Sequence, residues 1–124
     1  MIRIGSVLAK EMGKVRGKLK VRELASGSKI SIPVIIINGN SKGPVLWLNG
    51  GVHGDELNGI FAIRQLVTEL KLEQVNGILI CTLVCNPLAF QGRSKVSPLD
   101  NLDLDQQFPG NIDGLILQRI GYIL

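Results

Sequence analysis

The chain has 124 residues, which is enough for one small domain with a hydrophobic core and too few for two. Hydrophobic residues make up 45% and charged residues 19%, a composition that excludes a disordered chain. The apolar runs are no longer than strands, and charges interrupt the first twelve residues, so we expect neither a membrane span nor a signal peptide. We therefore expect a cytoplasmic protein without a membrane partner.

The first forty residues are predicted to be β structure. Strands are expected near 17–24 and at 29–37, with a turn of small residues between them. From Lys14 to Arg22, basic and apolar side chains alternate, which predicts a half-buried strand with one solvated basic face. This strand carries much of the net charge of +4. A nucleic-acid surface is the alternative interpretation, but aromatic residues are scarce and no recognition motif is present, so we expect no nucleic-acid partner.

Two strands and a helix are predicted next. Segments 44–48 and 78–85 are apolar on both faces, which is typical of strands inside a covered sheet. Between them, apolar residues recur at helical spacing, and Asp55 is a candidate cap for this helix. The order strand, helix, strand predicts a βαβ unit with a parallel pair of strands. A long polar loop at 86–110 and a last helix from about residue 114 are expected to follow.

The two cysteines, Cys81 and Cys85, lie in the second of these apolar runs. In a strand, residues four apart share one face, so both are expected there as buried free thiols. A disulfide or a metal pair is the alternative, but no histidine or further cysteine lies beside them. We assign them no function.

His53 and Glu56 are the candidate metal ligands. They lie three residues apart in a loop that follows a predicted strand, and in open α/β sheets ligands bind at this end of the strands. The turn from loop to helix can bring the imidazole and the carboxylate to one point. Zinc accepts both groups, and a catalytic zinc needs three protein ligands and an open position. The structural alternative is a loop histidine followed by a glutamate placed favourably near the helix dipole.

Three segments in order extend this pattern. The first, at 43–56, contains Asn-Gly-Gly-Val-His-Gly-Asp-Glu; the second, at 85–90, is Cys-Asn-Pro-Leu-Ala-Phe; the third, at 103–110, is Asp-Leu-Asp-Gln-Gln-Phe-Pro-Gly. They resemble the metal-binding segment, the Asn-Pro loop and the Asp-Leu-Asn-Arg-x-Phe-Pro-Gly segment of the succinylglutamate desuccinylase/aspartoacylase family, a part of the zinc carboxypeptidase clan.

The resemblance implies an α/β fold that is part of a zinc-carboxypeptidase-like domain, with a mixed or parallel sheet, flanking helices and N-terminal β strands. Residues 1–124 would form a single incomplete catalytic domain. Within it, 1–40 would be an N-terminal β segment and 41–124 a βαβ half that carries the metal site.

The same resemblance implies a zinc-dependent hydrolase that cleaves an amide or ester bond of a small acylated substrate. His53 and Glu56 would be the first two zinc ligands. The third ligand, a histidine, and the glutamate base would lie beyond Leu124, and His53 is the only histidine in the sequence. We therefore expect no catalytic residue within this chain and a missing C-terminal half as a partner. A homo-oligomer is a further expectation.

The substrate loop departs from the family pattern. Asp105 and Gln106 stand where the family has Asn-Arg, so the charge and the planar fork that suit a substrate carboxylate are absent. Either Arg93 or Lys95 matches the arginine expected upstream, and both stay candidate substrate-binding residues. A neutral or cationic amide or ester is then a better expectation than an N-acyl amino acid with a free carboxylate. A non-enzymatic module that binds metal or a partner without turnover is the second hypothesis.

Overall fold

A computed structural model describes residues 1–40 and 42–124 in full, and Ser41 only as the first residue of a strand. The chain has a four-stranded sheet in the order β3-β4-β6-β5 and a separate two-stranded sheet, β1-β2. Its strands are β1 (Ile2–Ile4), β2 (Val7–Ala9), β3 (Gly13–Glu23), β4 (Lys29–Asn38), β5 (Ser41–Asn49) and β6 (Asn76–Thr82). Its helices are α1 (Asn58–Glu69), α2 (Pro87–Gly92) and α3 (Ile116–Ile123), with short 3-10 turns η1 (Leu72–Gln74) and η2 (Leu104–Gln106).

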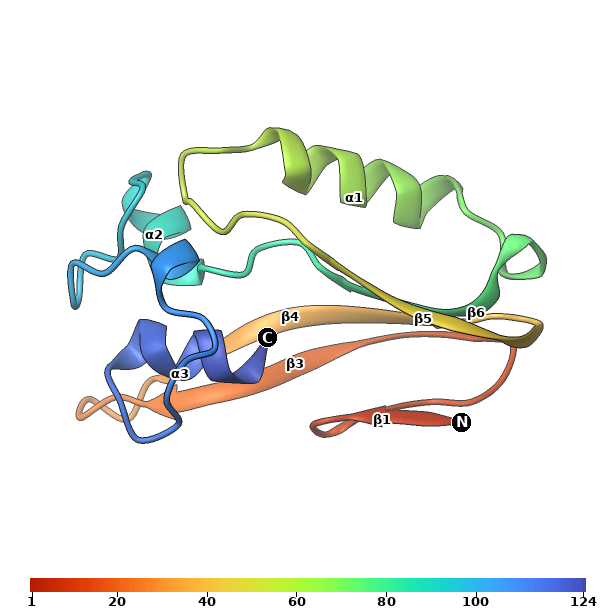
Figure 1. The fold of residues 1–124 in the computed structure, drawn as a ribbon, viewed down its shortest axis with the longest axis horizontal. Helices are drawn as coiled ribbons and strands as arrows, with labels where there is room; N and C mark the ends of the chain where they lie inside the picture. The colour runs from red at the N-terminus through yellow and green to blue at the C-terminus, as the bar shows by residue number, and fades with distance from the viewer.

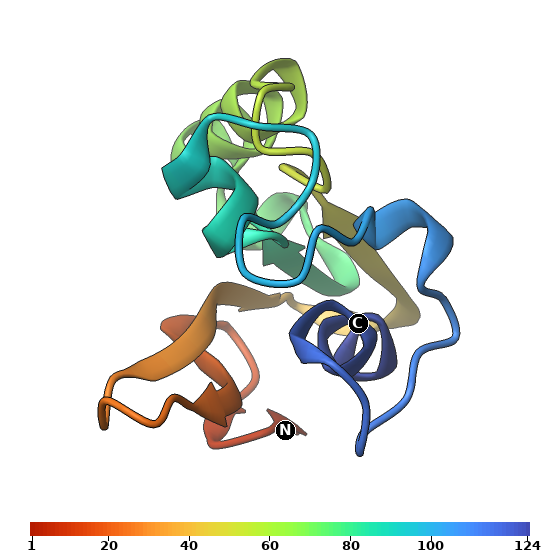
Figure 2. The same cartoon turned by 90° about the vertical axis from the view of Figure 1, so that its left-hand side faces the viewer.

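Both faces of the four-stranded sheet are covered. In Figure 1, α1 lies above the sheet and the β1-β2 pair lies below it. α3 shares a buried apolar cluster with β2 and therefore packs on the same face as the β1-β2 pair. The view from the end that carries α2 shows the same layers (Figure 2). One cluster of buried apolar side chains fills the space under α1, and a second joins the sheet to β1-β2 and α3. The expected α/β fold, a mixed sheet with flanking helices and β strands ahead of it, is confirmed. Among the described residues, no helix is long and apolar enough to cross a membrane.

The βαβ unit predicted from the sequence is present as β5, α1 and β6. β5 and β6 pair in parallel, with Leu48 opposite Cys81 and Asn49 opposite Thr82. β4 pairs antiparallel with β6 and with β3, which makes the sheet mixed. The carboxyl ends of β5 and β6 therefore lie side by side at one end of the molecule.

Two local predictions are wrong. Asp55 does not cap α1, because the helix starts later, at Asn58, and its N-cap residue Leu57 makes no side-chain cap hydrogen bond. The segment 86–110 is not one irregular loop, since it contains α2 and η2. Both elements are too short to produce a periodic apolar pattern. In the sequence, the start of α2 is marked only by Asn86 followed by Pro87.

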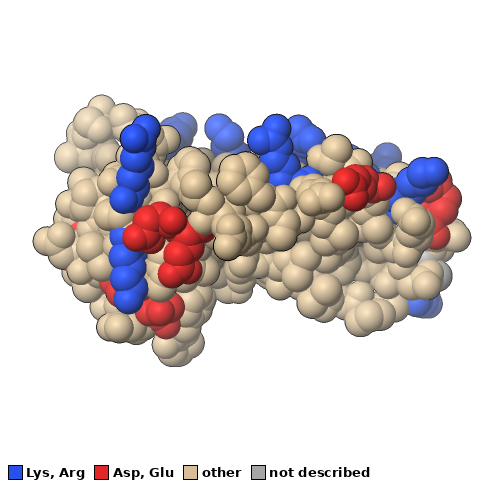
Figure 3. Space-filling model, turned by 90° about the horizontal axis from the view of Figure 1, so that it is seen from above, with Lys and Arg blue, Asp and Glu red and all other residues tan. Residues whose placement is uncertain are grey.

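Strand β3 has the alternating exposure that its sequence predicts. Leu19 and Val21 are buried. The basic side chains are exposed: Lys14, Arg16, Lys18, Lys20 and Arg22. The Lys14 ammonium reaches α1, where it donates to the Val67 carbonyl. Seen from the α1 side, basic side chains line one long edge of the molecule (Figure 3).

The cysteines are buried free thiols, as expected, but they do not share a strand face. β6 ends at Thr82, so Cys81 belongs to the strand and Cys85 to the loop after it. Burial raises the pKa of both thiols to about 11. Neither is therefore a thiolate nucleophile near neutral pH.

Strand β5 differs most from its prediction. It was expected inside the sheet, yet it lies at the sheet edge, and no strand among the described residues pairs with its outer side. Val45 is 57% exposed and Leu46 is 55% exposed. An apolar sequence on both faces indicates that a strand needs cover, but it does not say which element supplies that cover. β5 thus presents an apolar edge without a charged residue between Gly43 and Asn49.

We predict that the chain self-associates in solution through this edge, because unpaired strand edges and exposed apolar side chains favour pairing with another chain. The double variant Val45→Lys/Leu46→Lys should shift the protein to a monomer in sedimentation velocity. Phe61→Lys, which changes a side chain on α1 that is 59% exposed, is the matched control and should leave the association unchanged. A wild-type chain that sediments as a monomer and melts cooperatively contradicts the prediction.

Candidate metal centre

Two loops meet at the carboxyl ends of the parallel strands. The loop after β5 donates from Gly50 N to the Thr82 carbonyl at 2.9 Å, and Cys85 N donates to the Gly50 carbonyl at 2.8 Å. These backbone hydrogen bonds extend the pairing of β5 and β6 beyond the last residues of both strands. The first loop, which carries His53, is therefore fixed to the second before any side chain contributes.

Asn86 ties the two loops together. Its side-chain oxygen accepts a hydrogen bond from Ala89 N at 3.1 Å and caps α2, in which Pro87 occupies the first turn. Its side-chain nitrogen donates to the Val52 carbonyl at 3.3 Å, next to His53. The side chain is fully buried, so both bonds are made away from water. The Asn-Pro pair thus has a structural role that the sequence alone did not assign.

Gly54 allows the closest approach between the loops. A Cβ atom at this position would lie 2.0 Å from the carbonyl carbon and oxygen of Ala89, which is far inside van der Waals contact. The Gly54 N–H donates to the Ser94 carbonyl at 2.9 Å. Only a residue without a side chain permits this packing, which explains the glycine directly after His53.

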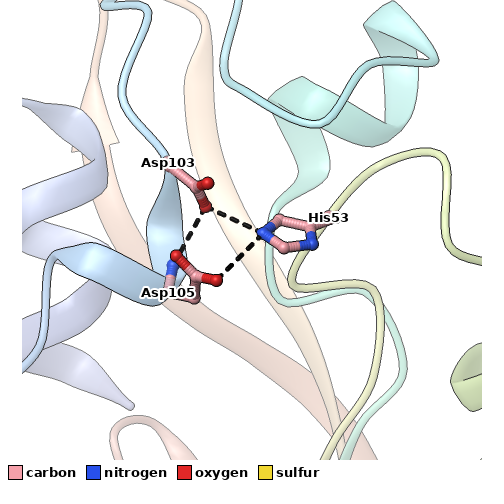
Figure 4. Close-up of side chains that lie close together, drawn as sticks. All are labelled: His53, Asp103 and Asp105. Atoms are coloured by element: carbon pink, nitrogen blue, oxygen red, sulfur yellow. Dashed lines mark hydrogen bonds and ion pairs between the residues drawn. The ribbon is translucent and has the colours of Figure 1, made fainter.

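His53 is the centre of the side-chain cluster (Figure 4). Its Nε2 atom lies 2.8 Å from Asp103 Oδ1 and 3.4 Å from Asp105 Oδ2. On the other side of the ring, Nδ1 lies 3.1 Å from Glu56 Oε1. The His53 and Asp103 side chains are only 11% and 10% exposed, whereas those of Asp105 and Glu56 are 50% and 72% exposed. The cluster has a buried pair and two carboxylates that reach solvent.

The charges in this cluster shift one another's pKa values. Hydrogen bonding to Glu56 and to Asp103 raises the pKa of His53, against the opposing effect of burial. Burial disfavours ionisation of Asp103, but hydrogen bonds from His53 and Lys95 outweigh it and lower the pKa of Asp103 to about 2. The hydrogen bond to Asp103 raises the pKa of Lys95. Asp103 is therefore a carboxylate at neutral pH.

The structure brings most of the predicted site residues together. His53 and Glu56 converge as expected, and Asp105 lies beside the same imidazole. The Lys95 ammonium lies 3.1 Å from Asp103 Oδ2, so Lys95 also belongs to the cluster.

Arg93 and Gln106 are placed differently. Arg93 is the C-cap residue of α2, with φ of 50°, and it lines a separate pocket of about 670 Å³ together with Phe61, Arg64 and Phe90. Gln106 is exposed on η2. Of the two candidates for the upstream cation, only Lys95 contacts the residues around His53.

Asp103 is the site residue that sequence reasoning missed. Its signal was present, because it is the first residue of the third family-like segment at 103–110. The separation of 50 residues from His53 hid the contact, since it depends on how η2 folds against the first loop. Asp103 is also the N-cap residue of η2, where its side chain accepts a hydrogen bond from Asp105 N.

Two groups of atoms here have the chemistry of metal ligands. His53, Asp103 and Asp105 each offer one ligand atom, and these atoms lie within 4.8 Å of one another. In this group, however, the Asp103 carboxylate already accepts from His53 and from Lys95. The second group is His53 Nδ1 with Glu56 Oε1, which are 3.1 Å apart. Two ligands of one tetrahedral zinc ion at the usual bond lengths lie about 3.3 Å apart, so this pair fits zinc.

The second group also has the surroundings that a metal-binding histidine requires. Such a histidine usually donates its other ring N–H to a carboxylate, which fixes the ring and its tautomer. Asp103 occupies this position at 2.8 Å from Nε2. With the proton on Nε2, the Nδ1 lone pair points toward Glu56, where a cation satisfies both groups. The residues present therefore fit a zinc ion bound between Nδ1 and Glu56.

The layered sheet and this histidine–carboxylate site define the class of the fold, which is zinc-carboxypeptidase-like. Solved structures of this class superpose on most of the chain. The product-bound ectoine utilization protein EutE (DoeB) from Ruegeria pomeroyi is 31% identical with a TM-score of 0.85, over 94% of this chain and 36% of its own. A succinylglutamate desuccinylase/aspartoacylase from Rhodobacter sphaeroides is 31% identical with a TM-score of 0.86, over 99% of this chain and 39% of its own.

The chain belongs to the succinylglutamate desuccinylase/aspartoacylase family, whose members are deacylating hydrolases, because residues 42–120 match the catalytic domain of that family. The N-alpha-acetyl-L-2,4-diaminobutyric acid deacetylase of Halomonas elongata is 36% identical over 91 residues, which are 73% of this chain and 26% of the relative. The chain thus spans between about a quarter and two fifths of the length of these relatives.

We predict that Asn86→Ala lowers the free energy of unfolding by about 2–4 kcal/mol, because it leaves the Val52 carbonyl without its donor and removes the cap of α2. Urea denaturation followed by circular dichroism measures the change. Asn40→Ala, at an exposed position between β4 and β5, is the control and should change stability by less than about 0.5 kcal/mol. Equal stability of the two variants would show that Asn86 does not hold the loops.

Proposed function

We propose that this chain provides the metal-binding part of a zinc-dependent deacylase, in which His53 Nδ1 and the Glu56 carboxylate bind the zinc ion. The observation that carries this proposal is the convergence of these two groups at 3.1 Å while Asp103 holds the opposite ring nitrogen. Membership of a family of deacylating hydrolases supports it. The substrate would be a small molecule with an acyl group on nitrogen or oxygen.

A zinc ion held by His53 and Glu56 would polarise an acyl carbonyl and lower the pKa of a bound water molecule. The residues of this chain position the two candidate ligands. Asp103 keeps the His53 ring in place and its proton on Nε2, and Glu56 approaches from the exposed side of the loop. The relatives are much longer than this chain, and we propose that the remaining ligand and the general base come from the part of the domain that they have in addition.

The charges around His53 bear on the substrate. Glu56, Asp103 and Asp105 are acidic, and the Lys95 ammonium is paired with Asp103. Gln106, where the family has arginine, adds no charge. A substrate carboxylate would meet repulsion here, whereas an uncharged or cationic group would not. We therefore propose that the substrate is an uncharged or cationic amide or ester.

We predict that the chain binds one zinc ion weakly, because two ligands do not close a coordination shell. In isothermal titration calorimetry, His53→Ala should reduce the affinity by about tenfold or more. Glu56→Gln should reduce the affinity as well. Glu69→Gln removes the same charge on the exposed side of α1, away from the site, and should bind like the wild type. Tight one-to-one binding that survives His53→Ala would show that zinc binds elsewhere.

The substrate preference gives a second prediction, for the chain supplied with the remaining part of the catalytic domain. Loss of a charge-assisted bidentate contact costs about 1.5–3 kcal/mol, and repulsion by Asp105 adds to it. The kcat/KM for an N-acyl amino acid should therefore be about two orders of magnitude below that of an enzyme with the arginine contact, and the unmodified enzyme should prefer the matching uncharged amide.

Asp105→Asn/Gln106→Arg should reverse this preference, and zinc chelation should abolish hydrolysis of both substrates. If the unmodified enzyme favours the free carboxylate and the double variant changes nothing, another residue binds the anion. If hydrolysis continues after zinc chelation, the proposed zinc dependence is wrong. If no hydrolysis occurs with the domain complete, the proposed deacylase is wrong and a module without turnover is the better description.

A further inference from the structure

The Asp103 carboxylate divides its two oxygens between two sides of the site. Oδ1 accepts hydrogen bonds from His53 Nε2 at 2.8 Å and from the Asp105 N–H at 3.3 Å. Oδ2 faces the Lys95 ammonium at 3.1 Å. Because the two oxygens are joined rigidly through one carbon, the contact of Oδ2 with Lys95 restricts the direction in which Oδ1 points.

The backbones on both sides of this contact are held in place. The carbonyl of Ser94, the residue before Lys95, accepts from Gly54 N at 2.9 Å, and the Ser94 hydroxyl donates to the Val96 carbonyl at 2.7 Å. Ser97 N, two residues after Lys95, donates to the carbonyl of Leu102, the residue before Asp103, at 3.0 Å. Backbone hydrogen bonds therefore link the loop of His53, the segment of Lys95 and the turn of Asp103. They keep the Lys95 ammonium close to the Asp103 carboxylate.

We propose that Lys95 is a positioning residue: it orients the Asp103 carboxylate so that the His53 ring keeps its proton on Nε2 and directs Nδ1 to the side of Glu56. The role of Nδ1 as a zinc ligand rests on the proposed function. The orientation and tautomer of the ring do not depend on it, because they are properties of the metal-free chain.

This role differs from anion binding, which the resemblance implied for Lys95. An ammonium that binds a substrate carboxylate needs a site whose other charges do not compete with the substrate. Lys95 instead lies among Asp103, Asp105 and Glu56, and it is already paired with the most buried of them. Its side chain is 56% exposed, so the ion pair by itself adds little stability, and its effect lies in geometry.

The first test uses the metal-free chain and the ¹⁵N chemical shifts of its single histidine, measured at a pH at which the ring is neutral. The wild type should show the Nε2–H tautomer. Lys95→Met should shift the ring toward a mixture of tautomers, and Lys95→Arg should restore the wild-type spectrum, because a guanidinium can also pair with Oδ2. Lys42→Met, an equal change of charge at the opposite end of β5, should have no effect.

The second test is zinc calorimetry on the same variants. Removal of a nearby positive charge would by itself strengthen the binding of a divalent cation. Weaker zinc binding therefore indicates that Lys95 positions Asp103, whereas stronger binding indicates only an electrostatic effect of its charge. Lys95→Met should weaken zinc binding about tenfold, as loss of a partner of a metal ligand does, and Lys95→Arg should bind like the wild type. Thermal melts confirm that each variant is folded.

Lys95→Met with an unchanged tautomer, or with zinc affinity equal to or above that of the wild type, overturns the inference. A wild-type chain that binds no zinc refutes the proposed function instead. In that case the tautomer of Lys95→Met alone decides: a shift supports the positioning role, and an unchanged spectrum overturns it.

Discussion

The parallel pairing of β5 with β6 is the constraint on which the site depends. It places the ends of both strands next to each other, with Asn49 opposite Thr82, and backbone bonds from Gly50 carry the pairing into the loops. Asn86 then fixes the carbonyl beside His53. Without this pairing, nothing would hold the His53 imidazole close to the segment at 103–110. The geometry of the candidate metal centre therefore depends on the pairing of β5 with β6, because no single loop positions all of its side chains.

The site concentrates negative charge around one imidazole. Asp103 is nearly buried, and a buried carboxylate is tolerated only when it is paired and hydrogen-bonded. His53 and Lys95 supply these partners from different loops. Asp105 and Glu56 reach solvent and add further charge. Such a cluster is balanced by a proton on the ring or by a cation, which is the electrostatic reason that it suits a metal ion.

The cover of the sheet is uneven. β4 and β6 are buried on both faces, with Ile36 and Ile37 of β4 on opposite faces and fully buried, because α1 packs on one side and β1-β2 with α3 on the other. β5 receives much less cover, although its sequence is as apolar as theirs. The site thus lies at the end of a well-covered strand, β6, whose neighbour β5 has an exposed edge. Since the relatives are much longer than the chain, this edge is where added structure would have the most apolar surface to bury.

The sequence by itself determined the elements with strong periodicity and the convergence of two candidate ligands in the first loop. The alternation of basic and apolar residues predicted β3, and apolar residues at helical spacing predicted α1. The spacing of His53 and Glu56 within one loop predicted that their side chains converge. Each of these signals is local in the sequence. Only the tertiary structure decided that Asp103 meets His53 across 50 residues, that Lys95 and not Arg93 joins them, and that β5 is an edge strand. These features depend on which segments pack together, and a contact between distant segments leaves no periodic trace in the sequence.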